Sequence, residues 1–237
     1  KLYKRLLKDK YWALEMLRNK SMVVGSTGLV GKSVIDYLIE KDISVLALVR
    51  NDQVSNNTLL NYYKIDFDDL QLSDEIFSDI KDIFICLGTT IKKAGSKDAF
   101  QKVDITYCYE IAKQAQASGV KNISIVTSLG SDSNAANFYL KSKGMIEDKI
   151  TKIDFDSISI HRPGLLIGAR NEMRLGEFIG QKIFPYILDP FLLGGMRKYR
   201  SVKGDILAKA MVNLSGCEEG VNYYYFDDFN KFAKGNY

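Results

Sequence analysis

The stretch Met22-Val23-Val24-Gly25-Ser26-Thr27-Gly28-Leu29-Val30-Gly31 decides the fold of this 237-residue chain. Three apolar residues, typical of a short buried strand, lead directly into a turn whose glycines are spaced G-x-x-G-x-x-G. Apolar residues then recur at helical spacing as far as Glu40. Glycine is needed where a side chain would block the turn, a bound phosphate or the contact between helix and strand. The order of strand, glycine turn and helix therefore predicts a phosphate-binding turn that includes Gly25, Gly28 and Gly31.

The same rhythm of strand and helix continues along the chain. Alternating strands and helices predict βαβ units, and the apolar runs are continuous, as expected for parallel strands buried on both faces. We therefore predict an α/β fold, a Rossmann-like doubly wound parallel sheet. The predicted strands are 22–24, 44–49, 59–65, 82–87, 122–127 and 155–161, the predicted helices are 33–40, 98–118 and 137–151, and helical patches at 175–183 and 205–214 precede a strand-like 221–226.

The length of the chain and its regular alternation of strands and helices predict a single domain that spans residues 1–237. Residues 1–20 are predicted to form an amphipathic lead-in helix, because leucines recur among lysines and arginines. Residues from about 170 to 237 are predicted to form a small C-terminal extension on the substrate side, packed beside the sheet ends. A homodimer is compatible with this fold class, although no sequence feature requires one.

Composition excludes several classes of function. The net charge of +4 is scattered along the chain, so we expect no nucleic-acid partner. Cys86, Cys108 and Cys217 are far apart and His161 is the only histidine, so we expect free thiols, a cytoplasmic location and no metal site. No apolar run is long enough for a transmembrane segment. A small-molecule substrate remains as the expected partner.

Tyr139 and Lys143 are candidate catalytic residues. They lie four residues apart in a predicted helix and so share one face. A neighbouring ammonium stabilises a phenolate, which suits a tyrosine for proton transfer. The preceding strand ends at Thr127 and Ser128, where a hydroxyl can hydrogen-bond a substrate carbonyl. We favour Ser128 for this role and keep Thr127 as the alternative, whereas His161 lies among apolar residues and is interpreted as a core histidine.

Arg50 follows the second predicted strand, directly before Asn51. An acidic residue at that point would bind the ribose 2′-hydroxyl of NAD, whereas an arginine can bind the 2′-phosphate of NADP. Asp52 is close by but lies past the end of the strand. The residues therefore favour NADP(H) over NAD(H).

These motifs, taken together, resemble the atypical short-chain dehydrogenases/reductases. The narrower resemblance is to the Tat-interacting oxidoreductase subfamily and its bacterial NAD(P)-binding relatives, and it covers roughly residues 8–215. The motifs that carry it are the glycine turn, Leu87-Gly88-Thr89-Thr90, Lys93-Ala94-Gly95, Val103-Asp104, Thr127-Ser128, Phe138-Tyr139-Leu140, Lys143-Gly144, Arg162-Pro163-Gly164 and Arg174-x-Gly176-Glu177.

The resemblance implies a Rossmann fold that holds NADP(H) across the strand ends, and it implies roles for individual residues. Asn51 departs from the family, which often has a second arginine there, and this weakens the NADP(H) preference without reversing it. By resemblance, Thr27, Gly28, Leu29 and Val30 contact the phosphates, Arg50 contacts the adenosine phosphate, Leu87 and Gly88 line the ribose and nicotinamide path, Tyr139 transfers a proton with Lys143 as its partner, and Leu166 and Arg174 close the nicotinamide side.

Two functions of different classes follow. The favoured one is an NADP(H)-dependent oxidoreductase that transfers a hydride between nicotinamide and an unidentified carbonyl or alcohol substrate. The alternative is an NADP(H)-binding regulatory or redox-sensor protein with little or no turnover. In that case the apolar and basic stretch Ile183–Arg200 would serve as a partner surface, whereas in an enzyme it would cover the substrate pocket. A nucleotide-sugar epimerase shares the core but is disfavoured, because the C-terminal region is short.

Overall fold

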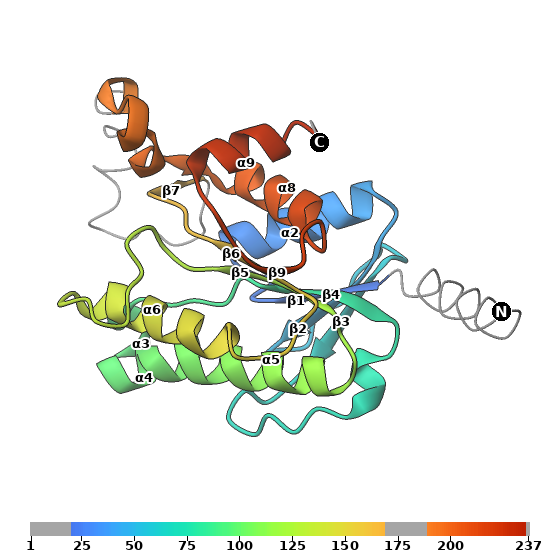
Figure 1. Ribbon diagram of the computed structural model, residues 1–237. Coiled ribbons are helices and arrows are strands. Elements are labelled where there is room, and N and C mark those ends of the chain that lie inside the picture. Colours follow the sequence, from blue (N-terminus) through green and yellow to red (C-terminus); the bar gives the residue numbers. More distant parts are fainter. Residues whose placement is uncertain (1–19, 169–188, 236–237) are drawn as a thin grey trace, which may run out of the picture.

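Figure 1 shows the computed structural model of the chain, which describes residues 20–168 and 189–235. Seven strands form one sheet in the order β3-β2-β1-β4-β5-β6-β9, and all neighbouring strands are parallel. This arrangement confirms the predicted Rossmann-like doubly wound sheet. The strands are β1 (Lys20–Val24), β2 (Ser44–Val49), β3 (Leu60–Lys64), β4 (Ile80–Ile85), β5 (Asn122–Val126), β6 (Ser157–His161) and β9 (Gly220–Tyr224).

Helices cover both faces of the sheet (Figure 1). On one face α2 packs against α8, and α8 packs against α9, while α5 and α6 pack together on the other face. The helix predicted for 98–118 is present as a continuous run of helical residues from Lys97 to Ala117, but its middle, Lys102–Tyr107, is a π-helical turn between α4 and α5. The helices are α2 (Leu29–Glu40), α3 (Ile91–Ala94), α4 (Lys97–Gln101), α5 (Cys108–Ala117), α6 (Phe138–Ile150), α8 (Gly204–Leu214) and α9 (Phe226–Phe232).

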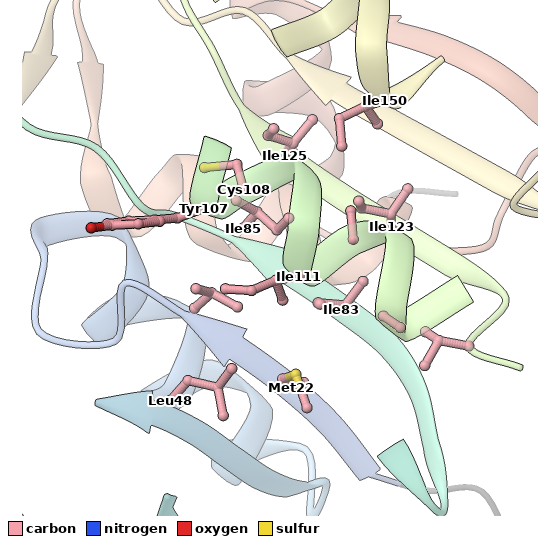
Figure 2. Close-up of a cluster of buried hydrophobic side chains, with 14 of the residues drawn as sticks. Met22, Leu48, Ile83, Ile85, Tyr107, Cys108, Ile111, Ile123, Ile125 and Ile150 are labelled. Atoms are coloured by element: carbon pink, nitrogen blue, oxygen red, sulfur yellow. The ribbon is translucent and has the colours of Figure 1, made fainter. Parts of the chain in front are cut away.

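The strands supply apolar side chains to two cores, one on each face of the sheet. Successive residues of a strand point to opposite faces. In β1, Met22 and Val24 belong to the core under α5 and α6, whereas Val23 belongs to the core under α2 and α8. Figure 2 shows Met22 in the first core, with Ile111 of α5 close to Ile83 of β4. Because both faces are buried, the central strands read as continuous apolar runs.

The C-terminal part of the chain differs from its prediction. β9 does not lie beside the sheet ends but extends the sheet, pairing with β6 so that Ile160 lies opposite Tyr223. The helix α9, directly after β9, was not predicted. A two-stranded parallel sheet of β7 (Leu166–Ile167) and β8 (Val202–Lys203) was also missed. The predicted helices at 1–20 and 175–183 lie outside the described residues, apart from Lys20.

His161, the last residue of β6, lies in a buried polar region that faces α9. Its side chain is fully buried and its Nε2 atom lies 2.9 Å from the Ser124 hydroxyl. The ring stacks on Tyr224 at 5.3 Å between centroids. No hydrogen-bond partner for Nδ1 is present within the described part of the chain. Burial lowers the pKa of His161 to about 3, so the imidazole is neutral in the folded protein.

Acid should therefore destabilise the protein through His161. The unfolded chain binds this proton near pH 6.5 and the folded chain only near pH 3, so stability present above pH 6.5 is lost as the pH falls. The loss is roughly 1.4 kcal/mol per pH unit below about pH 6. Since His161 is the only histidine, its imidazole carbon–proton NMR signals report it directly. We expect no titration between about pH 8 and pH 5; a midpoint near neutrality would contradict the prediction.

Candidate functional site

The glycine turn between β1 and α2 is shaped to admit a phosphate group. Gly25 has φ +84°, and a Cβ there would lie 2.6 Å from the Cys86 carbonyl carbon. A Cβ on Gly31 would lie 2.2 Å from the Gly25 carbonyl oxygen, so neither glycine can be replaced without moving backbone. Gly28 precedes α2, and no side chain caps this fully described helix. The first N–H groups of α2 are therefore left to bind an anion, which fits a pyrophosphate.

The remaining predicted phosphate-contacting residues lie in the same turn. Thr27 and Gly28 are exposed at its tip, Leu29 is half-buried at the first position of α2, and Val30 is buried beneath it. Thr27 and Gly28 can therefore meet a ligand directly, whereas Val30 can do so only through its backbone. The turn as predicted is brought together by the fold.

Arg50 lies directly after β2, at the carboxyl end of the sheet. It is exposed, and its guanidinium lies 5.2 Å from the centre of the Phe67 ring. The nearby Asp52 carboxylate forms an ion pair with Lys64 at 2.7 Å. Arg50 thus remains the charged side chain at the tip of β2, with an aromatic ring beneath it, where the adenosine end of a dinucleotide lies in this fold class.

Tyr139 and Lys143 lie on one face of α6, as predicted. Asn137 caps this helix by accepting the N–H of Leu140 at 3.1 Å, which fixes where the helix begins. The Lys143 Nζ atom lies 6.0 Å from the centre of the Tyr139 ring. Tyr139 is 38% exposed, whereas Lys143 is only 5% exposed. The phenol therefore opens to a ligand, while the ammonium lies beneath it in the protein.

Asp104 is the partner of Lys143, and no role was predicted for it. Its Oδ1 atom lies 2.7 Å from the Lys143 Nζ atom, and its Oδ2 atom accepts the Thr89 N–H at 2.9 Å. The Oδ1 contact is an ion pair without hydrogen-bond geometry, so this buried oxygen has no hydrogen-bond donor among the described residues. Burial alone would lower the pKa of Lys143, but Asp104, together with Tyr139 and Cys108, outweighs it and the pKa is raised. Lys143 is thus a fixed cation at neutral pH.

Two glycines, Gly88 and Gly144, allow the segments around the Lys143–Asp104 pair to approach one another. A Cβ on Gly88 would lie 3.5 Å from the Asp104 Oδ1 atom and 3.8 Å from the Lys143 Nζ atom, which places Gly88 at the ion pair. A Cβ on Gly144 would lie 2.1 Å from the Ser133 backbone nitrogen. Gly144 therefore lets α6 pack directly on the loop that follows β5. In the sequence, only the position of Gly144 next to Lys143 pointed to a role in the site.

Ser128 and Thr127 are distinguished by their hydrogen bonds. Thr127 is buried, and its hydroxyl donates to the His161 carbonyl oxygen at 3.3 Å. The Ser128 side chain is partly exposed and makes only a long bond, 3.4 Å, to the Leu129 carbonyl oxygen. The Ser131 hydroxyl accepts the Ser128 backbone N–H and donates to the Ser128 carbonyl oxygen. Ser128 thus has the more accessible hydroxyl of the two, and its role at a substrate carbonyl stays a prediction.

Of the three remaining predicted residues, two lie in the described part of the chain. Leu87 is half-buried against the core under α5 and α6, next to Gly88. Leu166 lies in β7 and packs against the core under α2 and α8. Arg174 lies outside the described residues. The structure therefore brings Gly88, Tyr139 and Lys143 together around Asp104, with the glycine turn of β1 bordering the carbonyl of Cys86 at the same sheet edge.

Replacing Asp104 with asparagine leaves the Lys143 ammonium buried without a countercharge. We expect the free energy of unfolding, measured by urea denaturation, to fall by about 3 kcal/mol. The double variant Asp104→Asn/Lys143→Met should lose less than the sum of the two single variants, because the pair acts as a unit. As a control, Asp52→Asn breaks the exposed pair with Lys64 and should change stability little. Additive losses, or an unchanged Asp104→Asn protein, would refute this role.

Comparisons with known proteins agree with this geometry. Residues 25–176 match a family described as NAD(P)H-binding. Protein HTATIP2 of Rattus norvegicus is 32% identical over 186 residues, which cover 75% of this chain and 76% of that protein. Protein FMP52, mitochondrial, of Meyerozyma guilliermondii is 37% identical over 190 residues, which cover 72% of this chain and 79% of that protein.

Solved structures share the fold at much lower identity. MoeE5 in complex with UDP-glucose and NAD has a TM-score of 0.65 at 14% identity, over 87% of this chain and 76% of that chain. The putative NAD-dependent epimerase/dehydratase from Bacillus halodurans has a TM-score of 0.63 at 17% identity, over 91% and 99%. This chain belongs to the NAD(P)H-binding family, in the group that contains HTATIP2 and the FMP52 proteins, which confirms the resemblance that its motifs indicate.

Proposed function

We propose that this protein is an NADP(H)-dependent oxidoreductase that acts on the carbonyl or alcohol group of a small molecule. The observation that carries the proposal is the exposed Tyr139 phenol above the buried pair of Lys143 and Asp104. A fixed ammonium near a phenol favours proton transfer to and from its oxygen. The uncapped N-terminus of α2 supports the binding of a dinucleotide at the same sheet edge.

Each residue of the site has a distinct task in this proposal. Tyr139 gives a proton to the substrate oxygen during reduction and takes it back during oxidation. Lys143 stabilises the phenolate and binds the nicotinamide ribose, while Asp104 keeps Lys143 charged and in place. Ser128 donates a hydrogen bond to the same substrate oxygen, which polarises the carbonyl. When bound, the cofactor supplies or accepts the hydride.

The preference for NADP(H) rests on Arg50. Its guanidinium is exposed at the tip of β2 and lies over the Phe67 ring, which limits the orientations it can adopt. A guanidinium in this place can bind a 2′-phosphate with two hydrogen bonds. Asp52, the acid nearest the strand end, is engaged by Lys64 and so does not compete for the ribose.

A regulator that binds NADP(H) without turnover is the second candidate. Such a protein needs the phosphate turn and Arg50, but it has no need of an acid–base group. Lys143 would still serve such a protein by binding the nicotinamide ribose, but the exposed Tyr139 phenol above buried Lys143 and Asp104 has a use only in proton transfer. Their burial beneath an exposed Tyr139 therefore favours turnover.

The cellular compartment stays a prediction. The relatives named FMP52 are described as mitochondrial, whereas the three dispersed cysteines suggested the cytoplasm. Within the described residues, no helix has both the length and the apolar character needed to cross a membrane.

Replacing Arg50 with glutamine should separate the two cofactors. We expect the dissociation constant for NADPH to rise roughly tenfold or more, because one charge-assisted contact to the 2′-phosphate is lost. Binding of NADH, which lacks that phosphate, should not change and serves as the internal control. Nicotinamide fluorescence titrations of wild-type and variant protein measure both constants. Equal weakening of both cofactors, or no change for NADPH, would show that Arg50 does not bind the 2′-phosphate.

Replacing Tyr139 with phenylalanine should abolish turnover and leave cofactor binding intact. We expect the rate of NADPH oxidation with a panel of aldehydes and ketones to fall at least about a hundredfold, since the proton donor is lost. The matched control is Tyr109→Phe, which removes another phenol that faces a lysine, Lys149, away from the site. A Tyr139→Phe enzyme with normal turnover would refute the assignment.

A further inference from the structure

A hollow of about 590 Å³ opens at the carboxyl ends of β5, β6 and β9. The loop after Ser128 forms one wall, and that loop is tied to the end of β6 because the Leu129 N–H donates to the Pro163 carbonyl oxygen at 2.9 Å. The hollow therefore adjoins the proposed catalytic serine. In open α/β sheets, ligands bind outside the carboxyl ends of the strands.

Arg162 lines the hollow and is held in one orientation. Its Nε atom donates to Glu147 Oε1 at 3.0 Å, and its Nη2 atom pairs with the other oxygen of the same carboxylate. Glu147 is buried and lies on α6, four residues after Lys143. The Nη1 atom is left to face Tyr225, whose hydroxyl oxygen lies 3.5 Å away.

Tyr225 is thereby prepared to donate a hydrogen bond into the hollow. Its hydroxyl oxygen accepts from the Arg162 Nη1 atom at 3.5 Å. The oxygen is the acceptor in this contact, so the hydroxyl hydrogen is directed away from the guanidinium and remains to be donated. A neighbouring guanidinium also polarises the O–H bond, which makes it a stronger donor.

The charged side chains of the walls leave one cation without a countercharge. Asp227 pairs with Arg197 at 2.7 Å. Asp228 accepts the Tyr225 N–H at 2.8 Å and lies in the first turn of α9, where the positive end of the helix offsets its charge. Lys198 lies over the Tyr199 ring at 5.6 Å and forms no ion pair with any described residue. The groups that remain to donate to a ligand are thus the Lys198 ammonium and the Tyr225 hydroxyl.

We propose that this hollow is the substrate site and that it selects carbonyl compounds which carry an anionic oxygen group, a carboxylate or a phosphate ester. Lys198 provides the charge, Tyr225 provides the hydrogen bond, and Arg162 is a positioning residue that acts through Tyr225. The carbonyl would then extend past the loop wall toward Ser128. This inference rests on the proposed function, because it names the substrate class of that same site.

Three benzaldehydes of similar size test the selection: 4-carboxybenzaldehyde, 4-formylphenyl phosphate and the neutral 4-formylbenzamide. Calorimetric titration into wild-type protein without cofactor measures binding apart from turnover. We expect one or both anions to bind at least about tenfold more tightly than the amide. Lys198→Gln and Tyr225→Phe should each remove most of that preference. Lys113→Gln on the exposed side of α5, which makes the same change in net charge, should leave it intact.

Arg162→Lys provides a second reading of the positioning role, since it keeps the charge but not the paired bonds to Glu147. The single variant Arg162→Lys should bind the anionic probes more weakly than wild-type protein. Added to Tyr225→Phe, the same substitution should cause no further loss of binding. If the anions bind selectively but NADPH does not reduce them, the substrate site stands and the proposed function fails. If the amide binds as well as the anions, if no probe binds, or if Lys198→Gln keeps the preference, the substrate site is overturned, even where the aldehydes are reduced.

Discussion

The buried ion pair between Lys143 and Asp104 is the interaction on which the rest of the site depends. It joins α6 to the π-helical turn that precedes α5, and the second carboxylate oxygen of Asp104 holds the loop after β4 through Thr89. Neither charge would be stable in this place alone, because burial without a partner costs several kcal/mol per ion. The pair therefore fixes three separate segments at once, and the position of Tyr139 above it follows from the same helix.

Much of the fold could be predicted because its signals are local. β2 has the predicted bounds, Ser44–Val49, since a strand buried on both faces reads as an unbroken apolar run. α6 begins after Asn137, whose side chain caps the helix. The glycine turn was recognisable for the same reason, since Gly25 and Gly31 meet backbone that any side chain would strike. Signals of this kind need only neighbouring residues.

What sequence reasoning missed depends on contacts between distant segments. The π-helical turn Lys102–Tyr107 differs from an α-helix by its hydrogen-bond register, and no local residue pattern announced it. Because the turn was not predicted, the contact between Asp104 and Lys143 was not predicted either. An aspartate between Val103 and Ile105, in an apolar stretch, could nevertheless have indicated a buried charge that needs a partner. Arg162 and Glu147 were missed as a pair for the same reason, because each meets its partner only when β6 packs beside α6.

One face of α6 carries the residues for both tasks of the proposed enzyme. Tyr139, Lys143 and Glu147 follow one another at intervals of four residues, so they lie in a line along the helix. Lys143 is fixed by Asp104 in the π-helical turn before α5, and Glu147 is fixed by Arg162 at the end of β6. A helix anchored at both points cannot slide or rotate without breaking a buried ion pair. The helix therefore sets the spacing between the Tyr139 phenol and Glu147, which holds Arg162. In the proposed enzyme this spacing would align the substrate with the proton-transferring group.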